Sequence, residues 1–162
     1  MKVLAGIFRV LSWGVYAVII LSLLVAAPIV FGYRSVIVLS GSMEPAYPVG
    51  SVIYYKAADF DNIAVGDVIT FGIGENALAT HRVVKKNEAE QSFVTKGDSN
   101  PSEDMEPVAY SAVVGKTANV AIPYAGYFAK YIQNMFMIVI MGVILLVGML
   151  VIPDKRNKIL KD

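Results

Sequence analysis

Residues 38–56 read VLSGSMEPAYPVGSVIYYK, a turn rich in Gly, Ser and Pro followed by a run of β-branched and aromatic residues. The second half, SVIYYK at Ser51–Lys56, has the composition of a β-strand. The first half holds Ser42 between Gly41 and Met43, and the prolines and glycine that follow indicate a tight turn. The segment therefore predicts a β domain in which Ser42 is displayed on a turn.

Similar runs recur as far as Ile122, and turn residues such as Gly72 and Asn100 separate them. The predicted strands are SVIVLS at Ser35–Ser40, SVIYYK at Ser51–Lys56, GDVITF at Gly66–Phe71, LATHRVV at Leu78–Val84, SFVTK at Ser92–Lys96 and AVVGKTANVAI at Ala112–Ile122. Many short strands within about 100 residues predict a mainly β fold class, a compact coiled antiparallel β domain.

Two long apolar runs flank this predicted domain. No charged residue occurs from Val10 to Phe31, which is 22 positions, or from Tyr131 to Pro153, which is 23. About 20 apolar residues in a helix cross the hydrocarbon core of a bilayer, so both runs are predicted as transmembrane helices. A helix at Ala125–Met135 is expected to lead into the second run. The alternative for the first run is a cleaved signal peptide, whose apolar region would be only about 7–15 residues long.

The charges beside the two runs predict the orientation of the chain. Lys2 and Arg9 precede the first run, whereas the second is followed by Lys155, Arg156, Lys158 and Lys161. Residues 32–130 carry 8 Lys and Arg against 11 Asp and Glu. The positive-inside rule then places both termini in the cytoplasm and the β domain outside. The predicted domains are a cytoplasmic N-terminus (1–9), a membrane anchor (10–32), an extracytoplasmic β domain (33–130), a second transmembrane helix (131–153) and a basic cytoplasmic tail (154–162).

Composition argues against several classes of function. The formal net charge is +1 and no basic stripe is present, which argues against nucleic-acid binding. The chain has no Cys, so disulfides and thiolate sites are excluded. Because it also has only one His, a zinc site is not expected, and no metal or cofactor is predicted.

The residue types of serine-based catalysis occur in order along the chain. A serine hydroxyl is a weak nucleophile until a base removes its proton, and a third group commonly orients that base. The chain offers Ser42, its single histidine His81, and two acids, Asp98 and Asp104, in TKGDSNPSED. Each of them alone is more typical of an ordinary turn, strand or solvated loop. Their joint presence, with the motifs around them, favours nucleophilic catalysis.

These motifs are SGSMEP at Ser40–Pro45, VGDVITF at Val65–Phe71, HRV at His81–Val83 and GDSN at Gly97–Asn100. Together they resemble type I signal peptidases, over a stretch from the first apolar run to Val114. The likeness is closest to the ER, archaeal and sporulation-associated branch, which carries His where the common bacterial enzymes carry Lys. One departure from the bacterial pattern GDNR is that its arginine is missing, and Asn100 is followed by Pro101.

The resemblance implies a role for each candidate residue. Ser42 attacks the scissile carbonyl, and His81 takes its proton and later passes it to the leaving amine. Asp104 matches the acid that orients the histidine, Asp98 matches the acid of the GD pair, and which of the two contacts His81 is left open. The oxyanion hole is expected to use the backbone N–H of Ser42 and the hydroxyl of Ser40.

The implied function is that of signal peptidase I, a membrane-bound serine endopeptidase. Such an enzyme removes N-terminal signal peptides from exported preproteins at the outer leaflet, cutting after small residues. The expected partners are signal peptides, the lipid bilayer and the secretion translocon, but not nucleic acid. The expected location is a prokaryotic cell membrane, crossed more than once, in preference to the ER membrane. The apolar residues Met43, Val49 and Phe60 are expected to be exposed and to rest on lipid, and for Met43 plain packing in the interior is an equal alternative.

Three alternatives assign these residues differently. A Ser–Lys peptidase would use Lys85 or Lys86 as the base, although both follow the family base position. A self-cleaving β-domain repressor of related fold would be soluble and carry a DNA-binding region, features that this sequence does not display. A non-catalytic membrane-tethered β module would bind exported proteins, but it would not require Ser42, His81 and the acidic pair together.

Overall fold

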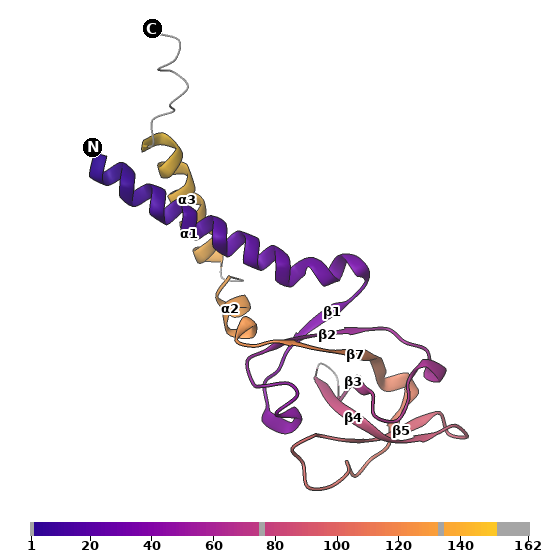
Figure 1. The fold of residues 1–162 in the computed structure, drawn as a ribbon. Helices are drawn as coiled ribbons and strands as arrows, with labels where there is room; N and C mark the ends of the chain where they lie inside the picture. Colours follow the sequence, from indigo (N-terminus) through magenta and orange to yellow (C-terminus); the bar gives the residue numbers. More distant parts are fainter. Residues whose placement is uncertain (1, 75–76, 133–134, 152–162) are drawn as a thin grey trace. The chain divides into compact units, whose positions relative to one another are not determined.

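The computed structural model describes residues 2–74, 77–132 and 135–151, and these residues form two compact units. One unit, Ala27–Phe128, contains the β-strands, and the other contains the long apolar helices (Figure 1). Each unit is described separately below.

The described strands of the β unit form one antiparallel sheet. The strands are β1 (Arg34–Ile37), β2 (Val52–Lys56), β3 (Val68–Gly72), β4 (Leu78–Asn87), β5 (Ser92–Lys96), β6 (Val108–Ala109) and β7 (Val113–Ile122). Their order in the sheet is β1-β2-β7-β3-β4-β5-β6, so the last strand lies in the middle and joins the two halves. The prediction of a mainly β, antiparallel domain is confirmed.

Alternation of side chains explains why the central strand β3 is buried on both faces, its one buried polar residue being Thr70. Val68 and Ile69 are consecutive in β3, and neither is more than 1% exposed. Successive strand residues face opposite sides of a sheet, so this strand is covered on both faces. Ile69 packs with Phe71, Val83 and other residues in one core, and Val68 packs in a second core that includes Met43, Tyr47 and Ile53.

Several details of the prediction were wrong. The first strand ends at Ile37 rather than Ser40, because a 3₁₀ turn (η2, Gly41–Met43) begins shortly afterwards. The short strand β6 was missed, since two residues carry no visible alternation. Phe60, predicted to be exposed on lipid, is 8% exposed and belongs to one core. Met43 is 2% exposed and belongs to the other core, which is the second of its two expected settings. Of that group Val49 is exposed.

The end of the β unit is fixed by a close contact between two glycines. The helix α2 (Ala125–Ile132) begins where the backbone N–H of Gly126 donates to the carbonyl of Gly50, at 2.9 Å. A Cβ on Gly126 would come within 2.5 Å of the Ile37 side chain, so the approach requires glycine there. Gly50 has a φ of 80°, a left-handed conformation that glycine adopts without strain. The predicted helix Ala125–Met135 therefore forms from its expected start, and residues 133–134 lie outside the described residues.

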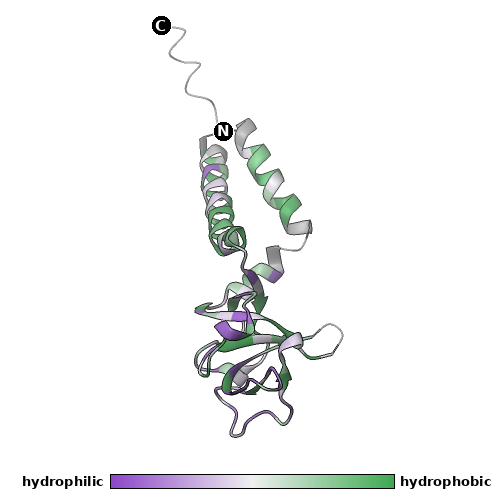
Figure 2. Cartoon of the chain, turned by 90° about the vertical axis from the view of Figure 1, so that its right-hand side faces the viewer, coloured by the Kyte–Doolittle hydropathy of each residue, from purple (hydrophilic) through white to green (hydrophobic). Residues whose placement is uncertain are grey.

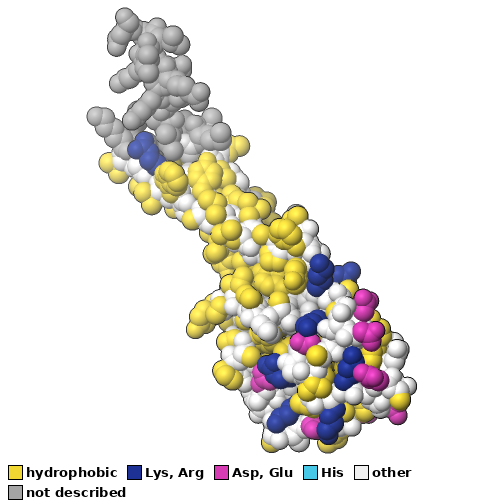
Figure 3. All heavy atoms as spheres, turned by 45° about the vertical axis from the view of Figure 1, so that its right-hand side comes forward, with side chains coloured by type: hydrophobic (Ala, Val, Ile, Leu, Met, Phe, Trp, Pro, Cys, Tyr) yellow, Lys and Arg dark blue, Asp and Glu magenta, His cyan; other side chains and the backbone are white. Residues whose placement is uncertain are grey.

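The other unit contains α1 (Lys2–Ala26) and α3 (Met135–Val151), and a 3₁₀ segment, η1 (Ala27–Phe31), follows α1 in the chain. Among the described residues, one helical stretch, Gly6–Phe31, is long and apolar enough by length and composition to cross a membrane. Hydrophobic residues dominate both helices in Figure 2, and on the face shown in Figure 3 the charged side chains gather over the β unit. The second predicted span, 131–153, includes positions outside the described residues, and α3 covers 17 of its residues.

The two helices of this unit pack through small residues. Ser12 and Val15 of α1 are buried, although most of that helix is exposed. Gly148 of α3 is buried as well, and a Cβ there would come within 2.5 Å of the Ser12 hydroxyl oxygen. Small residues allow such close approach between apolar helices in a bilayer.

Candidate active site

Ser42 is held on the η2 turn by its buried neighbour. The side chain of Met43 lies in a core with Tyr47, and the backbone N–H of Tyr47 donates to the Met43 carbonyl at 2.9 Å. The Tyr47 hydroxyl donates in turn to the carbonyl of Ala118 in β7, at 3.0 Å. The turn is therefore attached to the core through Met43, and Ser42 itself is half-buried at the surface.

His81 projects from β4, and its imidazole joins two other polar groups. Its Nε2 lies 3.3 Å from Ser42 Oγ, and its Nδ1 lies 2.6 Å from Asp104 Oδ2. The register of the sheet pairs His81 with Ile69 of β3, so the ring emerges beside the buried centre of the sheet. The ring also contacts Phe71 edge-on, at 6.1 Å between centroids. Ser42, His81 and Asp104 therefore form one continuous line of contacts.

Asp104 is oriented by a residue of β5. Its Oδ2 accepts the Thr95 hydroxyl at 2.6 Å, and its backbone N–H donates to the Thr95 carbonyl at 2.8 Å. The first bond orients the carboxylate, and the second holds the backbone of Asp104 against β5. Sequence reasoning missed Thr95, because a threonine inside a strand is too ordinary to give a signal, and only the fold brings it to Asp104.

Asp98, the other predicted acid, lies on Arg82 instead. Both of its carboxylate oxygens accept from the guanidinium, at 2.8 and 2.7 Å. Arg82 also donates to the carbonyl of Gly66, at 2.8 Å. The hydrogen bond that Arg82 donates to Asp98 is the main reason that the pKa of Arg82 is raised above its ordinary value. Burial raises the pKa of the neighbouring Tyr47, so its hydroxyl keeps its proton.

Strand geometry explains why the two acids have different partners. His81 and Arg82 are consecutive in β4, so their side chains leave opposite faces of the sheet. Asp104 meets the first of them and Asp98 meets the second. The question left open by the sequence, which acid contacts His81, thus has the answer Asp104.

The remaining candidates lie around this line of contacts. Ser40 Oγ is 3.5 Å from Ser42 Oγ, at the entrance to the turn. Lys85, a base in the Ser–Lys alternative, pairs with Glu103 at 2.9 Å on the surface. Lys86 donates to the carbonyl of Phe60 and lies over its ring, 4.3 Å from the centroid. Both lysine ammonium groups are therefore engaged away from Ser42.

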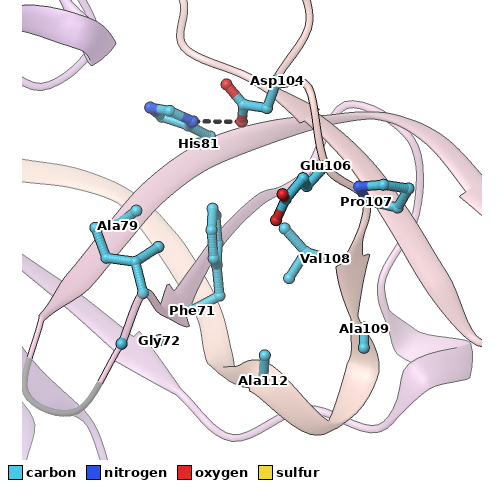
Figure 4. A pocket seen from close by; sticks show the side chains of 12 residues that line it. Phe71, Gly72, Ala79, His81, Asp104, Glu106, Pro107, Val108, Ala109 and Ala112 are labelled. Carbon is cyan, nitrogen blue, oxygen red and sulfur yellow. Dashed lines mark hydrogen bonds and ion pairs between the residues drawn. The ribbon is translucent and has the colours of Figure 1, made fainter.

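A hollow of about 660 Å³ adjoins the His81–Asp104 pair. Figure 4 shows Ala79, Phe71 and Val108 spread below the imidazole, with the Glu106 carboxylate between Asp104 and Val108. The dashed line in that view is the His81–Asp104 contact. In the part of the chain that the structure describes, no group of three or more His, Cys, Asp or Glu side chains could hold a metal ion.

Comparison with known proteins gives relatives whose matches cover from 43% to 78% of the chain. No protein-family model matches. Signal peptidase I W of Bacillus subtilis is 37% identical over 137 residues, which cover 78% of this chain and 67% of that protein. The signal peptidase complex catalytic subunit SEC11 of Komagataella phaffii is 32% identical over 108 residues, covering 57% and 62%. The subunit SEC11C of Homo sapiens is 38% identical over 73 residues, covering 43% of this chain and 38% of the human protein.

Proposed function

This chain belongs to the type I signal peptidase family, and from that premise we propose that it removes signal peptides from preproteins with Ser42 as nucleophile and His81 as base. One observation carries the assignment: the contacts run unbroken from Ser42 Oγ through both imidazole nitrogens to Asp104, at 3.3 and 2.6 Å. A nucleophile, a base and a group that orients the base are the parts that serine-based acyl transfer needs.

The first half of the reaction forms an acyl-enzyme. Ser42 Oγ attacks the scissile carbonyl carbon while His81 Nε2 takes the hydroxyl proton. The Asp104 carboxylate accepts a hydrogen bond from Nδ1–H, which favours the tautomer with a free Nε2 and stabilises the imidazolium that forms. His81 then gives its proton to the amine of the mature protein, which leaves. The contact of 3.3 Å is long for a hydrogen bond, as is usual before substrate is bound.

The second half releases the signal peptide. A water molecule gives a proton to His81 Nε2 and attacks the acyl carbon, and the proton returns to Ser42 Oγ as the ester bond breaks. In both halves a negative charge develops on the carbonyl oxygen. The backbone N–H of Ser42 and the hydroxyl of Ser40, which lies 3.5 Å from Ser42 Oγ, are the proposed donors to that oxygen.

Asp98 has a different proposed role. It makes two charge-assisted bonds to Arg82, the residue that follows His81 in β4. Through this pair, the GDSN loop is attached to the strand that carries the base. Asp98 is therefore proposed as a positioning residue of the site rather than as a group that touches the substrate.

The proposed setting is a membrane, with both termini on the cytoplasmic side. Gly6–Phe31 and α3 are the proposed spans, supported by their apolar sequences and by the close packing of Ser12 on Gly148. The β unit, within residues 33–130, would then work outside. Substrates would be exported preproteins cut after small residues at the outer leaflet, and the secretion translocon is a proposed partner.

The purified full-length chain in detergent, offered a preprotein, tests this function. Ser42→Ala removes only a surface hydroxyl and is expected to abolish cleavage while the protein accumulates normally in the membrane. The alternative of a non-catalytic module that binds exported proteins predicts no cleavage by the native chain either. Full cleavage by Ser42→Ala would rule out the serine mechanism.

A further inference from the structure

Three backbone carbonyls in residues 41–44, here called the nucleophile turn, accept hydrogen bonds from Ser99 of the GDSN loop. The Ser99 hydroxyl oxygen lies 2.8 Å from the carbonyl of Gly41 and 2.8 Å from that of Glu44. The backbone N–H of Ser99 donates to the carbonyl of Ser42 at 2.9 Å. A hydroxyl has one hydrogen, so the first two bonds are shared or alternate. Ser99 thus holds the turn on both sides of Ser42.

The bond to the Gly41 carbonyl affects the proposed oxyanion hole, because this carbonyl and the Ser42 N–H share one peptide plane. The carbonyl of Gly41 and the N–H of Ser42 belong to the same peptide unit, which is planar and trans. They therefore point in opposite directions, and a donor that fixes the carbonyl also fixes the direction of the N–H. Inside the turn the Gly41 carbonyl accepts the N–H of Glu44 at 3.0 Å, and the Ser99 hydroxyl is its second donor, from outside the turn. Such a donor also polarises the peptide unit, which strengthens the N–H as a donor on the other side.

The loop is built to bring Ser99 this close. A Cβ on the buried Gly97 would come within 2.7 Å of the Ser42 carbonyl oxygen and 2.8 Å of the Asn100 side chain. Only glycine therefore allows the loop backbone to lie against the turn. Next to it, Asp98 is clamped to Arg82 by two bonds. The loop is thus bound to β4 through Asp98 and to the turn through Ser99.

We propose that Ser99 is a positioning residue that aligns the Ser42 N–H with the oxyanion of the transition state. The inference rests on the proposed function, because it assumes that this N–H receives the developing charge. A bond that matters only when that charge forms should change kcat and leave KM unchanged. Truncating the Ser99 side chain removes two of the contacts and keeps the backbone bond to Ser42.

The test compares Ser99→Ala with the native full-length enzyme in detergent. We expect kcat for a preprotein to fall about three- to tenfold, the usual effect of losing one neutral hydrogen bond, with KM unchanged. A peptide aldehyde provides an independent readout. Ser42 Oγ adds to its carbonyl carbon while His81 takes the hydroxyl proton, and the resulting oxyanion occupies the hole. The affinity for this aldehyde should fall by the same factor as kcat.

Three further variants separate positioning from a general loss of structure. Ser99→Thr keeps the hydroxyl on an exposed residue and should restore both kcat and aldehyde affinity. Ser99→Cys keeps a similar shape with a weak donor, so its kcat and aldehyde affinity should also fall below those of the native enzyme. This variant takes the place of Ser99→Ala should the alanine variant not fold. Ser102→Ala, an exposed serine of the same loop region, is the control and should match the native enzyme.

Two results would overturn the inference. One is a Ser99→Ala enzyme with native kcat and native aldehyde affinity. The other is a loss of kcat that Thr does not restore and that tracks a lower thermal unfolding midpoint. The Ser42→Ala variant distinguishes this failure from that of the proposed function: cleavage by Ser42→Ala contradicts the function, whereas an inactive Ser42→Ala beside a fully active Ser99→Ala contradicts only the role of Ser99.

Discussion

At the scale of single residues, His81 has a position that no other basic side chain of the site shares. It is the single histidine of the chain, and its two ring nitrogens lie 3.3 Å from Ser42 Oγ and 2.6 Å from Asp104. Its side chain is 15% exposed, so the ring is shielded but can still be reached from solvent. Lys85 and Lys86, by contrast, are held by Glu103 and by the Phe60 carbonyl.

We therefore expect His81→Ala to lose cleavage as fully as Ser42→Ala, because members of a catalytic triad act as a unit. Lys85→Ala should retain most of the native rate, since its partner is a surface carboxylate. A lysine at position 81 should give little rescue, because its longer stem needs different surroundings. The measurement is the initial rate of preprotein cleavage by each variant. Substantial activity in His81→Ala together with loss in Lys85→Ala would mean that the base is misassigned.

Substituting Asp104 should affect mainly kcat, whereas substituting Asp98 should affect mainly the free energy of unfolding. Asp104→Asn keeps the shape but favours the wrong imidazole tautomer, and it should lower kcat on the order of 10⁴-fold with little change in thermal unfolding. Asp98→Asn removes the charge from a two-bond pair with Arg82 and should lower the free energy of unfolding by about 1–2 kcal/mol, with a smaller effect on kcat. Cleavage kinetics and thermal melts of both variants check this. Equal losses of kcat would argue for a direct part of Asp98 in the chemistry.

At the scale of elements, β7 determines how the site is assembled. It pairs with β2 on one side and β3 on the other, and so joins the half of the sheet next to the nucleophile turn to the half that carries His81. Gly115 lies at this junction, opposite Thr70 of β3. A Cβ there would come within 2.4 Å of the Lys56 carbonyl oxygen at the end of β2. The two halves can approach this closely only because the residue is glycine.

Gly115→Ala should therefore separate the two strands and lower the free energy of unfolding by about 1–3 kcal/mol, the usual cost of forcing a methyl group into a packed site. Gly72→Ala is a matched control, because it is also a strand glycine and its nearest contact would be an ordinary 3.9 Å. Denaturation of both variants in the same detergent gives the comparison. A Gly115→Ala protein as stable as the control would show that β2 and β7 can move apart without cost.

At the scale of the whole molecule, the distribution of charge is the feature with the clearest consequence. The charged residues lie in the β unit and at the two ends of the chain, and the proposed spans have almost none. A reporter fused after Asp162 should therefore behave as cytoplasmic. A reporter inserted at Ala89, in the exposed turn after β4, should behave as external. A C-terminal reporter found outside would show that the second apolar run does not cross the membrane.

The features that depend on local composition could be predicted from the sequence. The apolar runs, the β character of the middle segment and the start of α2 follow from composition and turn residues within short windows. The candidates Ser42 and His81 were also readable, because their motifs are specific and the histidine is unique. Strand ends were less accurate, as at Ile37, since a 3₁₀ turn competes with the strand there.

Contacts between residues that are distant in sequence follow from the folded sheet and its loops. Asp98 and Asp104 are equally plausible in sequence, and the alternation of His81 and Arg82 across β4 gives them different partners. Ser99 reaches Gly41 across 58 positions, and Ser42 reaches His81 across 39. Such contacts depend on strand register and on the paths of the loops, which are set by packing of the whole sheet. No local pattern of residue types encodes them, because periodicity specifies only the face on which a residue lies.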